Sequence, residues 1–302
     1  MTATENDAAP LSADAMRATG RAITDWYHRN RRDLPWRRTR DPYAVWVSEI
    51  MLQQTRVESV VGYYDRFIRE FPDTAALAAA SPERVLKAWE GLGYYSRAHN
   101  LRRGAQYLMQ RFGGALPASR DELIKIPGVG RYTAAAIASI AFNLPEPAVD
   151  GNVLRVVARL FAVRSPVNRA PVRRSIESIV RDMIPEGESG SFCQALMELG
   201  ALICLPGQPI CARCPVESRC AARQQGLTGS LPIREPRKKP LEQTRIVAVI
   251  ERRGKILIRQ RPPKGLLARM WEFPGWDHDK GGDALSRIAE RLSARGLRIE
   301  SA

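Results

Sequence analysis

The sequence lacks any run of apolar residues long enough to cross a membrane, which takes about 20 residues. Its first residues, MTATENDAAPLSADAM, also lack the basic and apolar regions of a secretory signal peptide. We therefore expect a cytoplasmic protein without a membrane partner, in which cysteines stay reduced.

Acidic residues are few for the length of the chain. The 302 residues include 32 Asp and Glu against 47 Lys and Arg, a net charge of +15, and 44% of them are apolar. The apolar content predicts a globular fold with a core. The basic excess favours a polyanionic partner such as a nucleic-acid backbone. A general compositional bias towards arginine is the alternative.

Cysteine is also scarce outside one segment. Four of the five cysteines lie in the 17 residues CLPGQPICARCPVESRC, as Cys204, Cys211, Cys214 and Cys220. Clustered thiolates in a reducing compartment bind metal more often than they form disulfides. Zinc sites usually contain two close Cys or His pairs, and this segment has only one CxxC. The spacing alone leaves zinc and an iron–sulfur cluster open. Cys193 stands apart and is expected to be a buried apolar residue.

The hydrophobic pattern divides the chain into four segments. Helical periodicity fills residues 16–224, where no alternating strand pattern occurs. Residues 1–15 are expected to be a disordered tail, and the Pro-, Gly- and basic-rich residues 225–243 a linker. In residues 244–302, TRIVAVIERRGKILIRQR predicts two strands around a turn near Gly254, and DALSRIAERLSARG predicts a short helix.

Capping signals mark where several of these helices begin. PYAVWVSEIMLQQTRVESVVGYYDRFIREF follows Asp41, and its first residue is proline, which suits the first turn of a helix. SPERVLKAWEGL opens with Ser81 and is expected to stop near Gly91 or Gly93.

The segment LIKIPGVGRYTAAAIASIAF predicts two helices joined by a tight turn over residues 119–142. Gly128 and Gly130 remove side chains where a backbone could approach a ligand. Free N–H groups of the turn and of the second helix would form an anion site, which in this basic chain suits a DNA phosphate. An ordinary turn between two helices would use the same residues.

This hairpin resembles the helix–hairpin–helix of the DNA glycosylase superfamily that includes endonuclease III. In that superfamily an aspartate follows the hairpin by about twenty residues, and PEPAVDGNVLRV places Asp150 there. The cysteine pattern resembles the superfamily's [4Fe–4S] loop, with Cys204, Cys211, Cys214 and Cys220 as ligands. The resemblance thus implies an iron–sulfur cluster, and not zinc, in an architectural role.

Two positions imply a subfamily. Tyr132 stands where bifunctional members carry the lysine that forms a Schiff base, and Glu49 stands where endonuclease III has no carboxylate. Residues 20–225 resemble the adenine glycosylases of the MutY type. The resemblance implies a mainly α fold, with the iron–sulfur loop at 204–220, and a monofunctional hydrolase of base excision repair. It would be a monomer on bacterial nucleoid DNA that removes adenine paired with 8-oxoguanine or guanine.

The resemblance also implies roles for individual residues. Glu49, in the apolar stretch AVWVSEIML, would protonate the leaving base, because burial raises the pKa of a carboxyl group. Asp150 would stay ionised and stabilise the sugar cation or a covalent intermediate, while also capping a helix. Asn152 would orient water or Asp150. Further residues would contact DNA. The adenine would be held by Trp36, Arg37, Leu52 and Gln194. The 8-oxoguanine and the gap in the base stack would be met by Gln54, Thr55, Leu92 and Tyr94, with Tyr94 as the wedge.

The last segment resembles the start of a Nudix-like domain. The family's later Phe-Ser/Thr-His motif does not follow Gly275, and the metal-binding glutamates of Nudix hydrolases are absent from the sequence. A small, incomplete α/β tail is therefore expected.

Three other functions compete with adenine excision. A thymine or uracil mismatch glycosylase of the same superfamily can also carry tyrosine in place of the lysine, but Glu49 and the tail argue against it. A non-catalytic iron–sulfur protein that binds DNA would leave Glu49 and Asp150 without a role. A nucleotide-pool hydrolase would need the missing glutamates.

Overall fold

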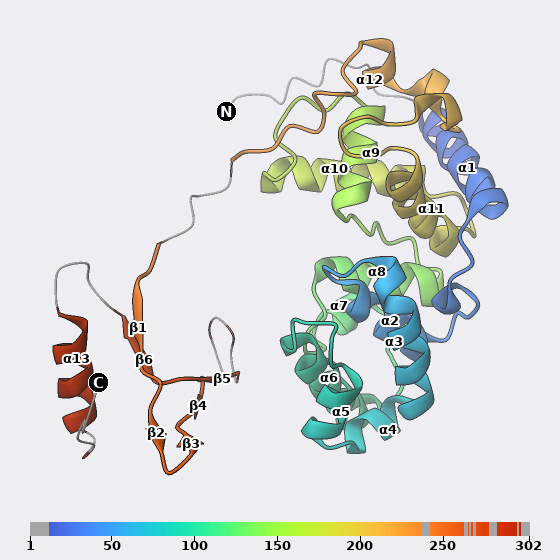
Figure 1. The fold of residues 1–302 in the computed structure, drawn as a ribbon. Coiled ribbons are helices and arrows are strands. Elements are labelled where there is room, and N and C mark those ends of the chain that lie inside the picture. Colours follow the sequence, from blue (N-terminus) through green and yellow to red (C-terminus); the bar gives the residue numbers. More distant parts are fainter. Residues whose placement is uncertain are drawn as a thin grey trace. The chain divides into compact units, whose positions relative to one another are not determined.

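The structure, a computed structural model, describes residues 12–236, 242–262, 265, 267, 270–277, 283–294 and 296. The chain separates into two compact units, residues 1–235 and 236–302 (Figure 1). Helix α1 begins at Ala13 behind Ser12, whose hydroxyl accepts from the N–H of Ala15 at 3.2 Å. The first residues of the expected tail, 1–11, lie outside the described residues.

The described residues of the first unit form two large hydrophobic cores, each inside its own group of helices. One core contains Trp46, Phe67, Trp89 and Leu108, all fully buried. It is enclosed by η1 (Pro35–Arg37), α2 (Pro42–Leu52), α3 (Val57–Glu70), α4 (Thr74–Ala79), α5 (Pro82–Ala88), α6 (Ser96–Phe112), α7 (Arg120–Leu123) and α8 (Arg131–Phe142).

The other core contains Ile23, Val157, Phe192 and Leu199. The helices around it are α1 (Ala13–Asn30), α9 (Gly151–Leu160), α10 (Ala170–Met183) and α11 (Ser189–Leu202), followed by η2 (Cys211–Arg213), η3 (Glu217–Arg219) and α12 (Ala221–Gln224). Helix α1 packs on α10 and α11, and α11 also packs on α8 of the first group. Helix α11 therefore joins the two cores, and the segment 143–150 connects them along the chain (Figure 1).

Several helix starts agree with the capping signals. The carboxylates of Asp41 and Asp150 accept from the N–H groups of Ala44 and Val153, both at 2.7 Å, and Ser81 caps α5. One expectation is wrong: the long helical segment that starts at Pro42 breaks at residues 53–56, where Gln54 has a φ of 57°. Helix α5 also ends earlier than expected, at Ala88.

In its described residues, the second unit contains short pieces of sheet and the helix α13. Strand β1 (Arg245–Val247) pairs antiparallel with β6 (Gly275–Asp277), β2 (Glu251–Arg252) with β3 (Lys255–Ile256), and β4 (Arg259–Gln260) with β5 (Trp271–Glu272). The expected turn lies at Arg253 and Gly254, and the expected helix is α13 (Ala284–Ser293). Within the described ranges, no helix is long and apolar enough to span a bilayer.

Candidate active site and cysteine loop

Glu49 projects from a helix that is buried along most of its length. Every residue of α2 from Tyr43 to Met51 is buried, because the helix packs between α3, α6 and α8. Glu49 is 7% exposed in the midst of these apolar side chains. A carboxyl group in such a position meets little water, which favours its neutral form.

A cavity opens beside Glu49 where η1, α2, α8 and α11 meet. It holds about 390 Å³ of space free of protein atoms, part of it open to solvent. Its walls are mostly apolar, with a guanidinium, an amide, a hydroxyl and a carboxyl group among them: Trp36, Arg37, Val45, Ser48, Glu49, Leu52, Ile140, Gln194 and Met197. The four residues predicted to hold the adenine all lie on this wall with Glu49, whereas Met197 had no role in the sequence analysis. Its position three residues after Gln194, on the same helix face, was the available signal.

Burial raises the pKa of Glu49 to about 7. A hydrogen bond from the Tyr132 hydroxyl opposes this rise, the negative charge of Asp150 adds to it, and the charge of Arg37 opposes it. No basic side chain forms an ion pair with Glu49 among the described residues. The carboxyl group can therefore hold a proton near neutral pH and release it to a bound base.

Tyr132 interacts with both Glu49 and Asp150. Burial raises the pKa of its phenol well above the ordinary value, and the charges of both carboxylates add to the effect. Its hydroxyl also lies 3.5 Å from the sulfur of Met197. The fold thus brings together Glu49 and Asp150, which are 101 residues apart in the sequence.

Asp150 is held by the first turn of α9. One carboxylate oxygen accepts from the N–H of Val153 at 2.7 Å, and the other accepts from the side-chain amide of Asn152 at 2.9 Å. Burial raises the pKa of Asp150, while these hydrogen bonds act in the opposite direction. The expected ionised carboxylate is thus favoured by its donors but opposed by its burial.

A buried arginine extends this hydrogen-bonded chain towards the cysteine loop. Arg155 donates to the side-chain oxygen of Asn152 at 2.8 Å, to the carbonyl of Gly200 at 2.8 Å and to the carbonyl of Cys204 at 2.7 Å. Three hydrogen-bonded steps therefore connect the backbone of the first loop cysteine with Asp150. Sequence reasoning missed Arg155, because bonds to main-chain carbonyls have no sequence signal.

Arg37, on the wall of the cavity, is fixed by Glu198 of α11. The two side chains form two hydrogen bonds of 2.8 Å, and Arg32 adds three more from its backbone and side chain at 2.8–3.0 Å. Burial alone would raise the pKa of Glu198, but the donors from Arg37 and Arg32 bring it to about 2. Glu198 is therefore ionised under all ordinary conditions and holds Arg37 in place.

The residues predicted to meet the 8-oxoguanine lie on two turns. Gln54 and Thr55 follow the end of α2, and Leu92 and Tyr94 precede α6. Tyr94 is 62% exposed, whereas Leu92 is 6% exposed and packs in the core. Of these two side chains, Tyr94 is the one available to a partner in this structure.

The hairpin turn combines a required glycine with free backbone donors. Gly128 has a φ of 85°, and a Cβ there would lie 2.7 Å from the side chain of Asn100. Gly130 precedes α8 with extended backbone and has open space beside it. The first N–H groups of α8 have no partner inside the helix and point outward at its N-terminus.

An arginine-lined groove lies on the other side of Tyr132. It holds about 660 Å³ of space free of protein atoms, part of it open to solvent, and its wall consists of Arg120, Arg131, Tyr132, Pro147, Val149, Ala170, Arg173, Arg174 and Glu177. Arg120 pairs with Glu146 at 3.5 Å, and Arg173 donates to the carbonyl of Val149 at 2.9 Å. Arg131 and Arg174 have no ion pair within the described part of the chain, which leaves their charges available to an anion.

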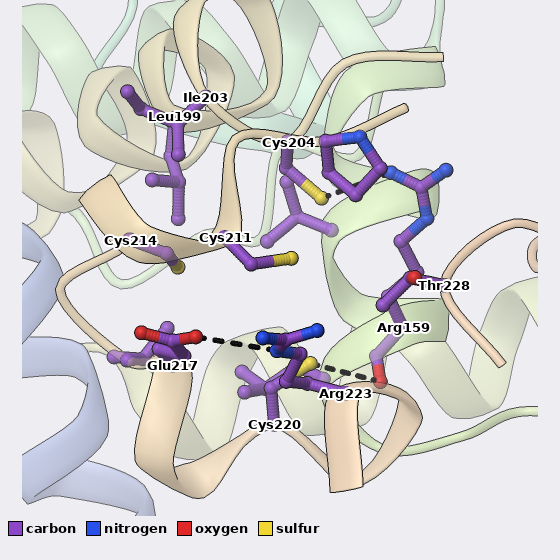
Figure 2. Close-up of a pocket in the computed structure, with 14 residues that line it drawn as sticks. Arg159, Leu199, Ile203, Cys204, Cys211, Cys214, Glu217, Cys220, Arg223 and Thr228 are labelled. Atoms are coloured by element: carbon purple, nitrogen blue, oxygen red, sulfur yellow. Dashed lines mark hydrogen bonds and ion pairs between the residues drawn. The ribbon is translucent and has the colours of Figure 1, made fainter. Parts of the chain in front are cut away.

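The four loop cysteines surround one space. Cys204, Cys211, Cys214 and Cys220 line about 430 Å³ free of protein atoms and partly open to solvent, and Figure 2 shows their side chains around it. All four are free thiols. Arg159 donates towards the sulfur of Cys204 at 3.4 Å and accepts through its carbonyl from Cys220 at 3.5 Å.

Within the described ranges, no three His, Cys, Asp or Glu side chains converge as they would around one metal ion. The four thiols line one shared space.

Comparisons with known proteins agree with this architecture. The family model of the HhH-GPD superfamily base excision DNA repair proteins matches residues 47–182, and that of the NUDIX domain matches residues 246–300. The solved structure of a thermostable thymine-DNA glycosylase is 28% identical, with a TM-score of 0.64 over 71% of this chain and 100% of that one. An endonuclease III–DNA complex, 24% identical with a TM-score of 0.60, shares the fold.

Curated relatives are similar over most of this chain. The adenine DNA glycosylase of Homo sapiens is 40% identical over 84% of this chain and 56% of its own length. That of Buchnera aphidicola subsp. Baizongia pistaciae is 35% identical over 83% of this chain and 72% of its own length. The chain thus spans little more than half of the human relative. The comparisons confirm the resemblance to adenine glycosylases, the helix–hairpin–helix fold and the Nudix-like segment.

Proposed function

Because this chain belongs to the adenine DNA glycosylase family of the HhH-GPD superfamily, we propose that it hydrolyses the N-glycosidic bond of adenine mispaired with 8-oxoguanine or guanine in DNA. The observation that carries the proposal is Glu49, a buried carboxyl group with a pKa of about 7 on the wall of a largely apolar cavity. A purely structural glutamate in this position would need a basic partner, as Glu198 has.

In the proposed reaction the adenine leaves the base stack and enters the cavity. Glu49 gives its proton to the base, the bond between the sugar and the base breaks, and its electron pair leaves with the adenine. Asp150 stabilises the sugar cation that remains. Water then adds to the sugar and loses a proton, which leaves an abasic site, and Asn152 orients Asp150 for this step through the bond of 2.9 Å.

Tyr132 supports a monofunctional reaction. A phenol cannot form the imine that a lysine forms with the sugar, and no lysine lies on the wall of the cavity. We expect the DNA strand to stay intact after base removal and to break only on alkali treatment. Rapid β-elimination coupled to base loss in the wild-type protein would contradict a monofunctional enzyme.

The strand with the adenine would bind over the hairpin and the arginine-lined groove. Free N–H groups at the start of α8 suit a backbone phosphate. The guanidinium groups of Arg131 and Arg174, which form no ion pair with another described residue, suit the neighbouring phosphates. Gly130 has open space beside it, which leaves room for a phosphate to approach the backbone closely. These contacts supply affinity without reading the sequence.

The mispaired partner would meet the two turns described above. Gln54 and Thr55 have hydrogen-bonding groups for the 8-oxoguanine, and the exposed ring of Tyr94 suits the gap in the stack. Leu92 stays a prediction as a DNA contact, since it packs in the core.

The four loop cysteines would hold a [4Fe–4S] cluster. The fit rests on their shared space, their free thiols and the guanidinium donor of Arg159 beside the sulfur of Cys204. When bound, such a cluster supplies a cross-link through four thiolates and a redox-active centre. Arg155 and Arg159 bind the carbonyls of Cys204 and Leu205 and so hold the loop against α9. About four irons per chain and broad absorption near 400 nm are expected, and stoichiometric zinc after anaerobic purification would contradict the proposal.

A panel of duplexes tests the function directly. Single-turnover excision would be measured on A:8-oxoguanine, A:G, T:G and U:G pairs in the same sequence. We expect removal of adenine and no removal of thymine or uracil. Excision of thymine or uracil instead would favour the mismatch glycosylases of the superfamily, and binding without any excision would favour a non-catalytic protein.

A further inference from the structure

One buried guanidinium joins the two turns that carry the mispair contacts. Arg97 lies in the first turn of α6 and is 7% exposed. Its Nη1 donates to the carbonyls of Ile50 at 3.1 Å, Met51 at 2.8 Å and Gln53 at 2.6 Å. Its Nη2 donates to the carbonyls of Leu92 at 3.1 Å and Gly93 at 3.2 Å. One side chain therefore binds the end of α2 and the turn before α6.

No carboxylate neutralises this cation among the described residues. Three of its acceptors are carbonyls at the C-terminal end of α2, where the helix dipole has its negative end. The guanidinium also lies near the rings of Trp89 and Tyr94, 5.3 Å and 5.7 Å from their centroids, at distances that suit cation–π attraction. The two terminal nitrogens of the planar guanidinium each serve one set of carbonyls, an arrangement that the single nitrogen of a lysine does not reproduce.

The bound carbonyls stand directly before two residues with strained backbone. Gln53 precedes Gln54, whose φ is 57°, and Gly93 precedes Tyr94, whose φ is 48°. A positive φ is uncommon for residues other than glycine and persists where the surroundings hold it. By fixing the carbonyls of Gln53 and Gly93, the guanidinium orients the peptide units that lead into both residues.

We propose that Arg97 is a positioning residue that couples the two turns, so that Gln54, Thr55 and Tyr94 meet a mispair as one surface. The use of this surface for a mispair rests on the proposed function, whereas the coupling itself does not. Loss of the guanidinium would release both turns together. It would leave Glu49 and its cavity in place, because none of the bonds of Arg97 reaches the residues that line this cavity.

Amide hydrogen exchange tests the coupling without relying on activity. In Arg97→Lys we expect exchange to rise at least about tenfold in residues 53–55 and in residues 91–95, with little change in α9 and α11. Arg102→Lys is the matched control, because Arg102 lies on the same helix and donates to a carbonyl elsewhere, that of Ala80 at 2.6 Å. Faster exchange in one turn only, or in neither, would overturn the proposal.

The wild-type protein supplies a second test if Arg97→Lys does not fold. Coupled turns should open as one unit, so the amides of both should share one opening free energy under mild denaturant. Two clearly different opening free energies would overturn the coupling.

Excision assays then test what the coupling does. For Arg97→Lys we expect the single-turnover rate on A:8-oxoguanine to fall at least about tenfold, and the preference for A:8-oxoguanine over A:G to shrink. Arg102→Lys should keep both. Equal losses of rate on the two duplexes would overturn a role of Arg97 in reading the mispair. The coupling of the two turns would then be decided by the hydrogen-exchange data alone. If the wild type excises no adenine at all, the proposed function fails and the exchange result still stands.

Discussion

Two glutamates near the same cavity are both buried, yet their pKa values are shifted in opposite directions. Glu49 on α2 is 7% exposed and has a pKa of about 7, whereas Glu198 on α11 is 1% exposed and has a pKa of about 2. Burial raises both values. The difference arises from Arg32 and Arg37, which together donate five hydrogen bonds to Glu198.

The comparison shows that burial alone does not assign a role to a carboxyl group. Among the described residues, Glu49 has no ion-pair partner and accepts a hydrogen bond from the Tyr132 hydroxyl, so it can hold a proton for transfer. Glu198 is saturated with charged donors and can hold a guanidinium in place. The first arrangement suits chemistry and the second suits architecture, so changes at the two positions should have different consequences.

The largest expected effect is on activity at Glu49. Glu49→Gln keeps the shape of the side chain but cannot release a proton, so adenine excision should fall about 10²–10⁴-fold or more. DNA affinity should persist, because it comes mainly from phosphate contacts. Single-turnover excision and binding of the same duplex check both statements. Glu70→Gln, at an exposed position, serves as the control. If Glu49→Gln loses DNA binding together with helical content, Glu49 has a structural role instead.

The next effect is on stability at Glu198. Glu198→Gln leaves two arginines without a buried anion and should lower the free energy of unfolding by about 3 kcal/mol. This is the lower end of the range for a broken buried ion pair, because Arg32 is partly exposed. The melting temperature should fall roughly 6–12 °C, as measured by circular dichroism. Glu49→Gln should cause no comparable fall, because it breaks no buried ion pair. A similar fall in both variants would remove the contrast between the two sites.

The two sites should also give stability opposite pH dependences. The folded pKa of Glu49 lies above its ordinary value of 4.5, so its contribution to stability is complete below pH 4.5 and is lost as the pH rises through about 7. The folded pKa of Glu198 lies below 4.5, so its contribution is complete above pH 4.5 and is lost as the pH falls towards 2. The free energy of unfolding of both Gln variants and the wild type would be measured with denaturant from pH 3.5 to 8. The loss of stability above pH 4.5 that is due to Glu49 should be missing only in Glu49→Gln, and the loss below pH 4.5 that is due to Glu198 only in Glu198→Gln.

A smaller effect is expected outside both sites, in the arginine-lined groove. Changing Arg131 and Arg174 together to alanine should weaken DNA binding and reduce the slope of log affinity against log salt by about 2. The excision rate of bound DNA should change little. Arg181→Ala, on α10 as Arg174 is, should keep the wild-type slope. An unchanged slope in the double variant would place the strand elsewhere.

Much of this account follows from local sequence patterns. The Asp–Pro cap and the apolar stretch predicted a buried Glu49, and the same kind of signal predicted Asp150 as an N-cap. Local patterns failed where a partner lies far along the chain. The surroundings of Glu198, ALMELGALI, are as apolar as those of Glu49. Only the fold brings Arg32 and Arg37 to it, across more than 160 residues.

The bonds to main-chain carbonyls were equally hidden. Arg97 and Arg155 bind main-chain carbonyls. Every residue has the same main-chain carbonyl whatever its side chain, so the sequence does not reveal such a partner. The break after α2 was missed because QQTR contains neither glycine nor proline. The opposite exposure of Leu92 and Tyr94, two residues apart in one turn, depends on backbone angles that sequence patterns do not specify.

The central claim, that Glu49 is the proton donor, is tested most directly by the pH dependence of single-turnover excision on an A:8-oxoguanine duplex. The wild-type rate should fall as the pH rises above about 7, approaching tenfold per pH unit, because deprotonation of Glu49 removes the acid. Glu49→Gln should be slow and should lack this decline. A wild-type rate that stays constant from pH 6 to 9, or a Glu49→Gln rate equal to that of the wild type, would contradict the claim.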